Sequence, residues 1–155
     1  MKHSTRRATV LGLAGLLSAA AVAAPAFAAL GGDAASVSAD AAKMKSQTRA
    51  RAASGYTVNE LTLDSGTVVR EYVSADGKVF AVTWKGPVLP DLLQTLGTYF
   101  QEFKAVAATP HSGHHHLNVD HPEFVMRSGG HMRAWSGKAY VPALLPPNFS
   151  LSEIQ

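Results

Sequence analysis

The sequence predicts an α+β fold: an antiparallel three-stranded meander with a packed amphipathic helix, an N-terminal helix and a C-terminal β-hairpin. Two observations predict it. An Asp-Gly turn at 76–77 separates two strand-like runs. The segment that follows the second run carries large apolar side chains at helical spacing. Most of the large apolar residues lie in or beside 66–103. We therefore expect the core to form around this stretch.

The first 28 residues have the pattern of a secretory signal peptide. Its three parts are a basic start with Lys2, Arg6 and Arg7, an apolar stretch over 10–24, and a small-x-small cleavage site at 26–28. The apolar stretch is shorter than the roughly 20 residues that span a bilayer. We expect a mature chain that begins at Ala29, lacks a transmembrane segment, and is periplasmic or secreted. The Arg6-Arg7 pair leaves both ordinary and twin-arginine export open.

The net charge and the absence of cysteine restrict the classes of function that are compatible with the sequence. Residues 29–155 keep 11 of the 14 Lys and Arg and all 11 Asp and Glu, so their net charge is zero with neutral His. A nucleic-acid partner would require a positive field, so none is expected. The chain has no cysteine, which excludes disulfides and acylation as a lipoprotein. We expect one α+β domain over 29–141.

The N-terminal helix is predicted over 33–52, where Ala, Lys, Arg, Gln and Met predominate. Ser54-Gly55 would end it. Three strands follow in the prediction, over 56–63, 67–73 and 79–84. Because side chains alternate along a strand, Phe80, Val82 and Trp84 share one face. We expect this face to meet the core.

The second helix is predicted over 91–106, after Pro90 at a position that suits a first helical turn. We expect it to lie across the meander through the side chains of Leu92, Leu96, Tyr99, Phe100 and Phe103.

The remaining chain is predicted to be a loop, a hairpin and a tail. A His-rich loop spans about 107–122, and a strand, a Gly129-Gly130 turn and a return strand occupy 123–136. A short strand follows over 139–141. Residues 142–155 form a Pro-rich C-terminal tail.

Several short motifs together resemble a known family. They are the Ala-Leu-Gly-Gly start at 29–32, Gly66 to Tyr72, Gly77 to Val82, Trp84, Gly86-Pro87, Pro90 to Leu92, Leu96-Gly97 and Tyr99-Phe100. With this combination the chain resembles a proteobacterial family of small exported proteins classed as a domain of unknown function. The resemblance covers nearly all of the mature chain. It implies no activity and no site residue.

Five of the seven histidines lie in the predicted loop, which makes it the main cluster of chemically active side chains. Imidazole nitrogen binds zinc, copper and nickel, which usually take three or four ligands. The candidate metal ligands are His111, His114, His116 and His121, with Asp120 or Glu123 as oxygen donors. In an extended chain His114 and His116 point the same way. A polar connecting loop without metal is the other interpretation.

Three function classes follow. We expect first a non-enzymatic binding or scaffold module of the cell envelope, whose partner would be an envelope or exported protein. A metal-binding protein that uses the His-rich loop is the second class. An enzyme is the third, because no nucleophile motif and no Gly-rich phosphate loop stands out. No catalytic or cofactor-binding residue is assigned.

Overall fold

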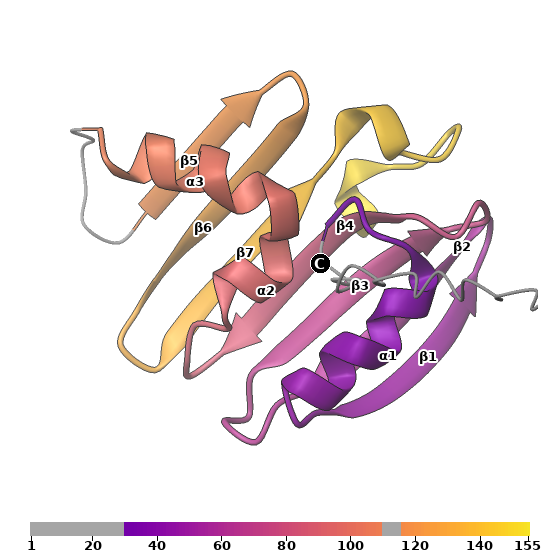
Figure 1. The fold of residues 1–155 in the computed structure, drawn as a ribbon, viewed down its shortest axis with the longest axis horizontal. Coiled ribbons are helices and arrows are strands. Elements are labelled where there is room, and N and C mark those ends of the chain that lie inside the picture. The colour runs from indigo at the N-terminus through magenta and orange to yellow at the C-terminus, as the bar shows by residue number, and fades with distance from the viewer. Residues whose placement is uncertain (1–29, 110–115) are drawn as a thin grey trace, which may run out of the picture.

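The computed structural model describes residues 30–109 and 116–155, and all of the strands in them belong to one antiparallel sheet. Its seven strands have the spatial order β1-β2-β3-β4-β7-β6-β5 (Figure 1). The strands are β1 Gln47–Ala53, β2 Tyr56–Thr62, β3 Val68–Ser74, β4 Val79–Gly86, β5 His116–His121, β6 Phe124–His131 and β7 Ala134–Tyr140. The helical elements are α1 Ala34–Lys43, α2 Leu92–Leu96, η1 Gly97–Tyr99, α3 Phe100–Ala107, η2 Pro142–Leu144 and η3 Leu151–Glu153.

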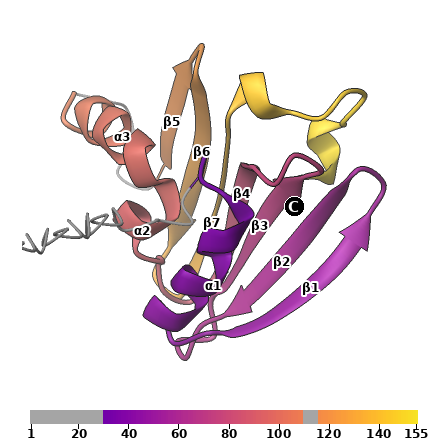
Figure 2. The ribbon, with the colours of Figure 1, turned by 45° about the vertical axis from the view of Figure 1, so that its right-hand side comes forward.

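The three α-helices lie on one face of the sheet, which we call the helix face (Figure 2). Its core combines buried residues of α1 and α2 with residues of strands β2 to β7. Leu61, Val69, Val82, Trp84 and Met126 are among the side chains that this face buries. Burial of apolar surface is the main stabilising contribution to a fold of this kind, so the helix face holds the fold together.

The opposite face, which we call the outer face, carries a second and smaller core. Residues 142–155, predicted as a Pro-rich tail, pack on it: Ile154 is buried, and Phe149 contacts Phe80 with ring centroids 4.9 Å apart. Tyr56 and Tyr72 complete the aromatic cluster. This segment covers only part of the outer face. Across the described residues 30–109 and 116–155, no helix has the length and apolar character needed to cross a membrane.

The predicted fold class is wrong, and the N-terminal region shows why. Instead of a three-stranded meander there is a seven-stranded sheet, and the predicted helix over 33–52 contains strand β1. Helix α1 ends where Lys45 adopts φ 48°. The two-residue Ser54-Gly55 turn then lets β1 pair with β2 along its whole length. Sheet pairing here overrides the helix propensity of the residues.

The second predicted helix is divided, and one face assignment is reversed. Gly97, with φ 54° and ψ −123°, ends α2, and α3 begins at Phe100. Leu92 and Leu96 are buried against the sheet, as predicted. However, Phe80 lies on the outer face, because a register irregularity next to Val73 displaces it from the face of Val82.

The predicted C-terminal hairpin is part of the same sheet. Part of the predicted His-rich loop forms β5, which pairs with β6, and β7 pairs with β4. Gly129 and Gly130 lie within β6, and the chain turns at Met132-Arg133 instead. A Cβ at Gly130 would lie 2.3 Å from the carbonyl oxygen of Ala134. Glycine is therefore needed there for close strand approach rather than for a turn.

Candidate functional site: a basic depression on the outer face

The part of the outer face that residues 142–155 leave uncovered contains a depression of about 530 Å³. It crosses four neighbouring strands in the order β4, β7, β6 and β5. The side chains that characterise it are those of Lys85, His116, Asn118, Arg127, Ser136 and Lys138, and we call this set the basic depression. Residues 154–155 lie at its boundary with the covered part.

Strand register places the three cationic residues of the basic depression at neighbouring positions of the sheet. Arg127 of β6 lies directly opposite Lys138 of β7, and directly opposed Cβ atoms on one face are roughly 5 Å apart. Lys85 is diagonal to Lys138, because its own partner on β7 is Ser136. Like charges at opposed positions destabilise a sheet. An anion between them would remove this repulsion.

The floor of the basic depression is made of small residues. Gly129 lies opposite Ser136, and these two residues separate Lys85 on one side from His116 on the other. A glycine and a serine leave the backbone exposed where longer side chains would fill the space. In this row, the long side chains of Lys85 and His116 therefore flank a shallow centre that carries the hydroxyl of Ser136.

Only one of these cations has an acidic partner among the described residues. Arg127 donates from Nη2 to Oδ1 of Asp120 at 2.5 Å, and from Nη1 to the carbonyl oxygens of Val119 and Met126. These bonds hold its guanidinium in place. Within residues 30–109 and 116–155, Lys85 and Lys138 take part in no ion pair. The two amines are thus available to a ligand.

A second pocket of about 580 Å³ lies on the other side of residues 154–155. It is lined by side chains of both charges, among them Arg49, Arg51, Glu60, Arg70 and Glu153. Arg70 forms an ion pair with Glu60, with Nε and Oε2 2.8 Å apart. The carbonyl oxygen of Gln155 accepts hydrogen bonds from Nη1 of Arg70 and from the hydroxyls of Tyr72 and Thr83. This pocket is more nearly charge-balanced than the basic depression.

A tyrosine next to this pocket has a perturbed pKa. The hydroxyl of Tyr56 donates to Oε2 of Glu153 at 2.6 Å. That hydrogen bond, followed by desolvation and the negative charge of Glu153, raises the pKa of Tyr56 above its ordinary value of 10.0. The phenol therefore stays protonated at neutral pH and acts as a structural link between β2 and residues 142–155.

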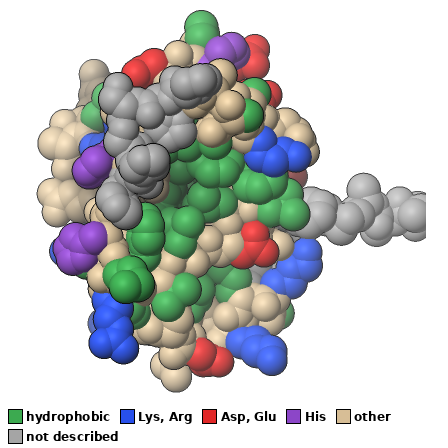
Figure 3. Space-filling model, turned by 90° about the vertical axis from the view of Figure 1, so that its left-hand side faces the viewer, with side chains coloured by type: hydrophobic (Ala, Val, Ile, Leu, Met, Phe, Trp, Pro, Cys, Tyr) green, Lys and Arg blue, Asp and Glu red, His purple; other side chains and the backbone are tan. Residues whose placement is uncertain are grey.

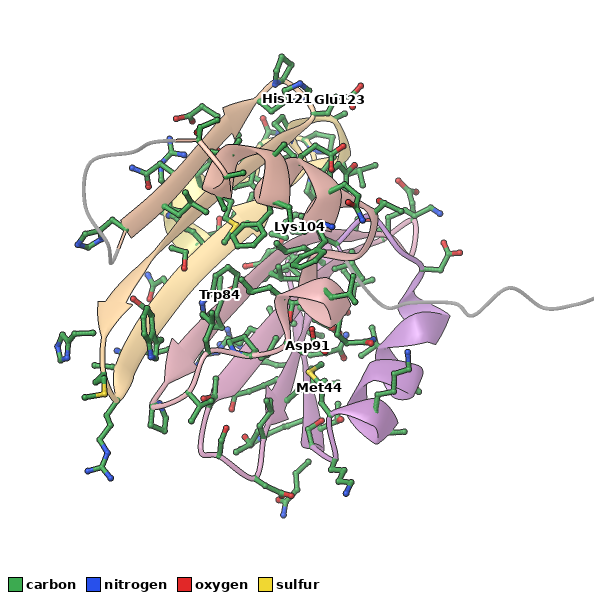
Figure 4. All side chains as sticks on the ribbon, turned by 60° about the vertical axis from the view of Figure 1, so that its left-hand side comes forward. Met44, Trp84, Asp91, Lys104, His121 and Glu123 are labelled. Carbon is green, nitrogen blue, oxygen red and sulfur yellow. The ribbon has the colours of Figure 1, made fainter. Side chains whose placement is uncertain are left out.

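The predicted metal ligands are only partly within the described residues. His111 and His114 lie outside them. His116 begins β5 on the outer face, whereas His121 ends β5 on the helix face, where Figure 4 shows it beside Glu123. Five residues of strand separate the two imidazoles by roughly 17 Å. Among residues 30–109 and 116–155, no group of three or more His, Asp or Glu could hold a metal ion.

Sequence reasoning missed Lys85, Arg127 and Lys138, which come from three strands. Each is an unremarkable polar residue of an alternating strand pattern. The register of β4, β7 and β6 brings them together. Strands β4 and β7 are neighbours in the sheet although they are far apart in the sequence. The signal available in the sequence was the run of Gly and Ser at 128–130 and 136–137, of which Gly129-Gly130 was predicted to form a turn.

A different kind of surface is visible from the side shown in Figure 3, where hydrophobic side chains gather near the centre and charged ones surround them. Exposed apolar side chains among the described residues include Val88, Leu89 and Leu93, from the β4–α2 connection and α2. Trp84 lies deeper, on the helix face, and is 2% exposed (Figure 4). These residues carry no charge pattern that identifies a ligand.

The comparisons with known proteins place the chain in a family. No curated protein and no solved structure shows significant similarity to it. A family model described as "Protein of unknown function (DUF2844)" matches residues 26–154, which include all seven strands. The predicted resemblance to a domain of unknown function is thereby confirmed. The chain belongs to the DUF2844 family of proteins of unknown function.

Proposed function

We propose that this protein is an exported, non-enzymatic binding module of the cell envelope, and that the basic depression holds an anionic ligand. The observation that carries the proposal is the opposition of Arg127 and Lys138, with Lys85 diagonal to them, on an uncovered sheet face. Asp120 offsets the charge of Arg127, whereas Lys85 and Lys138 have no acidic partner among the described residues, so part of the electrostatic cost remains in the free protein. A bound anion turns the same arrangement into a stabilising one.

The chemistry of the lining residues favours an oxyanion, either a carboxylate or a phosphate. Amines and a guanidinium form charge-assisted hydrogen bonds with such groups, and these are stronger than neutral ones. The hydroxyl of Ser136 and the amide of Asn118 add neutral hydrogen-bonding groups at the floor and the rim. A volume of about 530 Å³ suits a ligand of the size of a charged sugar or a phosphate ester.

Export is the second part of the proposal and rests on the basic, apolar and small-residue pattern of residues 1–28. Those residues lie outside the described part of the chain. The untagged protein should be recovered from the periplasm or medium, with an intact mass that begins at Ala29. A protein found in the cytoplasm at full mass would contradict export without affecting the binding site.

Ligand binding can be measured by calorimetry, with inorganic phosphate and galacturonate titrated separately into the protein. The variant Lys85→Gln/Lys138→Gln should lose binding, and Lys104→Gln on α3 should retain it as the matched control. Binding should also weaken as ionic strength rises, because exposed charges are screened. The difference between the two probes identifies the oxyanion. Equal affinity in the double variant and the wild type would contradict the site.

A further inference from the structure

Strand β1 is the edge of the sheet, and its other side has no neighbour among the described residues (Figures 1 and 2). It pairs with β2 over all seven of its residues. Residues 47–52 are exposed, and Ala53 is only partly buried. An unpaired edge offers a row of backbone N–H and C=O groups to another extended chain. The edge therefore has the geometry for strand addition.

The composition of β1 conflicts with its structure. Six of its seven residues are Gln, Arg or Ala, which favour helices, and Thr48 is the one good strand former. Buried side chains do not compensate, because β1 contributes none to either core. Conflicts between local preference and fold are expected at functional sites. A strand stabilised from only one side gains the missing backbone hydrogen bonds when a partner strand adds to it.

The charges of β1 identify the partner. Arg49 and Arg51 are two residues apart, so both project from the outer face. Within residues 30–109 and 116–155, neither guanidinium forms an ion pair or a side-chain hydrogen bond. The nearby Glu60 is paired with Arg70, and Glu153 accepts from Tyr56. Acidic side chains at alternate positions of an added strand would meet both arginines.

The same two arginines argue against a second copy of this chain. In antiparallel self-pairing centred on Ala50, Arg49 of each copy would face Arg51 of the other. Like charges directly opposite each other destabilise a strand pair. Charges of this kind on an edge also prevent unspecific association. Self-pairing in this register is thus disfavoured, whereas an acidic strand would meet both arginines favourably.

We propose that β1 is a docking edge for an extended acidic segment of a partner protein, which adds to the sheet as an eighth strand. Backbone hydrogen bonds would supply most of the affinity, and Arg49 and Arg51 would select the acidic sequence. This site lies on a different part of the sheet from the basic depression, and it does not depend on an anion bound there.

The test uses a capped seven-residue peptide in which glutamate alternates with threonine and valine, and a second peptide with lysine for each glutamate. Hydrogen exchange of the mature protein is measured with each. The glutamate peptide should protect the amides of residues 47–53, and the lysine peptide should not. In Arg49→Glu/Arg51→Glu the preference should reverse, with glutamate-peptide affinity reduced about ten-fold by the loss of two exposed ion pairs.

Two controls make the outcome decisive. Lys85→Gln/Lys138→Gln should bind the glutamate peptide as the wild type does, which separates this proposal from the anion site. Sedimentation should show a monomer. The proposal is overturned if neither peptide protects the amides of β1 in either protein, or if the protection is independent of the charge of the peptide. It is also overturned if β1 is protected only by dimerisation of the protein.

Discussion

The two faces of the sheet differ in what covers them and in what they bury. The helix face holds one continuous apolar core under α1, α2 and α3. The outer face is apolar only beneath residues 142–155, and its remaining part exposes cations around small residues. Strand β4 contributes to both, with Trp84 in the helix-face core and Lys85 in the basic depression. The contrast shows that one strand can supply stability on one face and recognition on the other.

The largest effect is expected from truncation of the helix-face core. Trp84 is 2% exposed, and Trp84→Ala should reduce the free energy of unfolding by about 3–5 kcal/mol. Urea denaturation followed by circular dichroism measures the change. Trp135→Ala provides the matched control, because Trp135 is only partly buried and should cost less. Equal costs for the two variants would mean that the deep burial of Trp84 in the helix-face core does not set its contribution to stability.

The part of the outer face that residues 142–155 cover should contribute somewhat less to the free energy of unfolding. Ile154 is 3% exposed under the aromatic cluster, and Ile154→Ala should cost roughly 2–4 kcal/mol. Leu151 belongs to the same segment but is 42% exposed, so Leu151→Ala should cost well under half as much. If both changes are neutral in thermal denaturation, residues 142–155 do not stabilise the sheet.

Substitution of Gly137, which lies against the indole of Trp84, tests how closely the helix face is packed. A Cβ at Gly137 would lie 2.2 Å from a ring carbon of Trp84, so Gly137→Ala should cost about 1–3 kcal/mol through overpacking. Trp84→Ala removes the obstructing ring. The double variant should therefore lose less stability than the sum of the single changes. Strict additivity in denaturant titrations would show that the ring does not lie on Gly137.

The smallest effect on stability is expected in the basic depression. Lys138→Gln should change the free energy of unfolding by no more than about 0.5 kcal/mol, with the sign toward stabilisation, because it removes the charge opposite Arg127. The same variant should bind phosphate or galacturonate less tightly. A loss of stability above about 1 kcal/mol would mean that Lys138 has a structural role, and the two faces would then be less different than proposed.

Local sequence patterns predicted several elements correctly. Strands were predicted over 56–63, 67–73 and 79–84, and β2, β3 and β4 occupy these places. The Asp-Gly turn at 76–77 joins β3 to β4, with Gly77 at φ 75°. Leu92 and Leu96 pack against the sheet. These features depend on side-chain alternation, turn chemistry and helical spacing, all of which act over a few residues.

The candidate sites could not be predicted in the same way. Arg49 and Arg51 were assigned to a helix, because a residue's intrinsic preference says nothing about a neighbouring strand that can pair with it. Lys85 and Lys138 are 53 positions apart and become diagonal neighbours only through β4–β7 pairing. The metal prediction for His111 and His114 concerns residues outside the described part of the chain and stays a prediction.

The sequence by itself determined the places of β2, β3 and β4, the Asp-Gly turn, the apolar stripe of α2, and the absence of disulfides. Tertiary structure decided that β1 is a strand, that Phe80 faces outward, and that β7 joins β4 to complete one sheet. The physical reason is that short-range preferences are worth fractions of a kcal/mol per residue. Pairing between distant strands and burial of their side chains is worth more, and it therefore set the final arrangement.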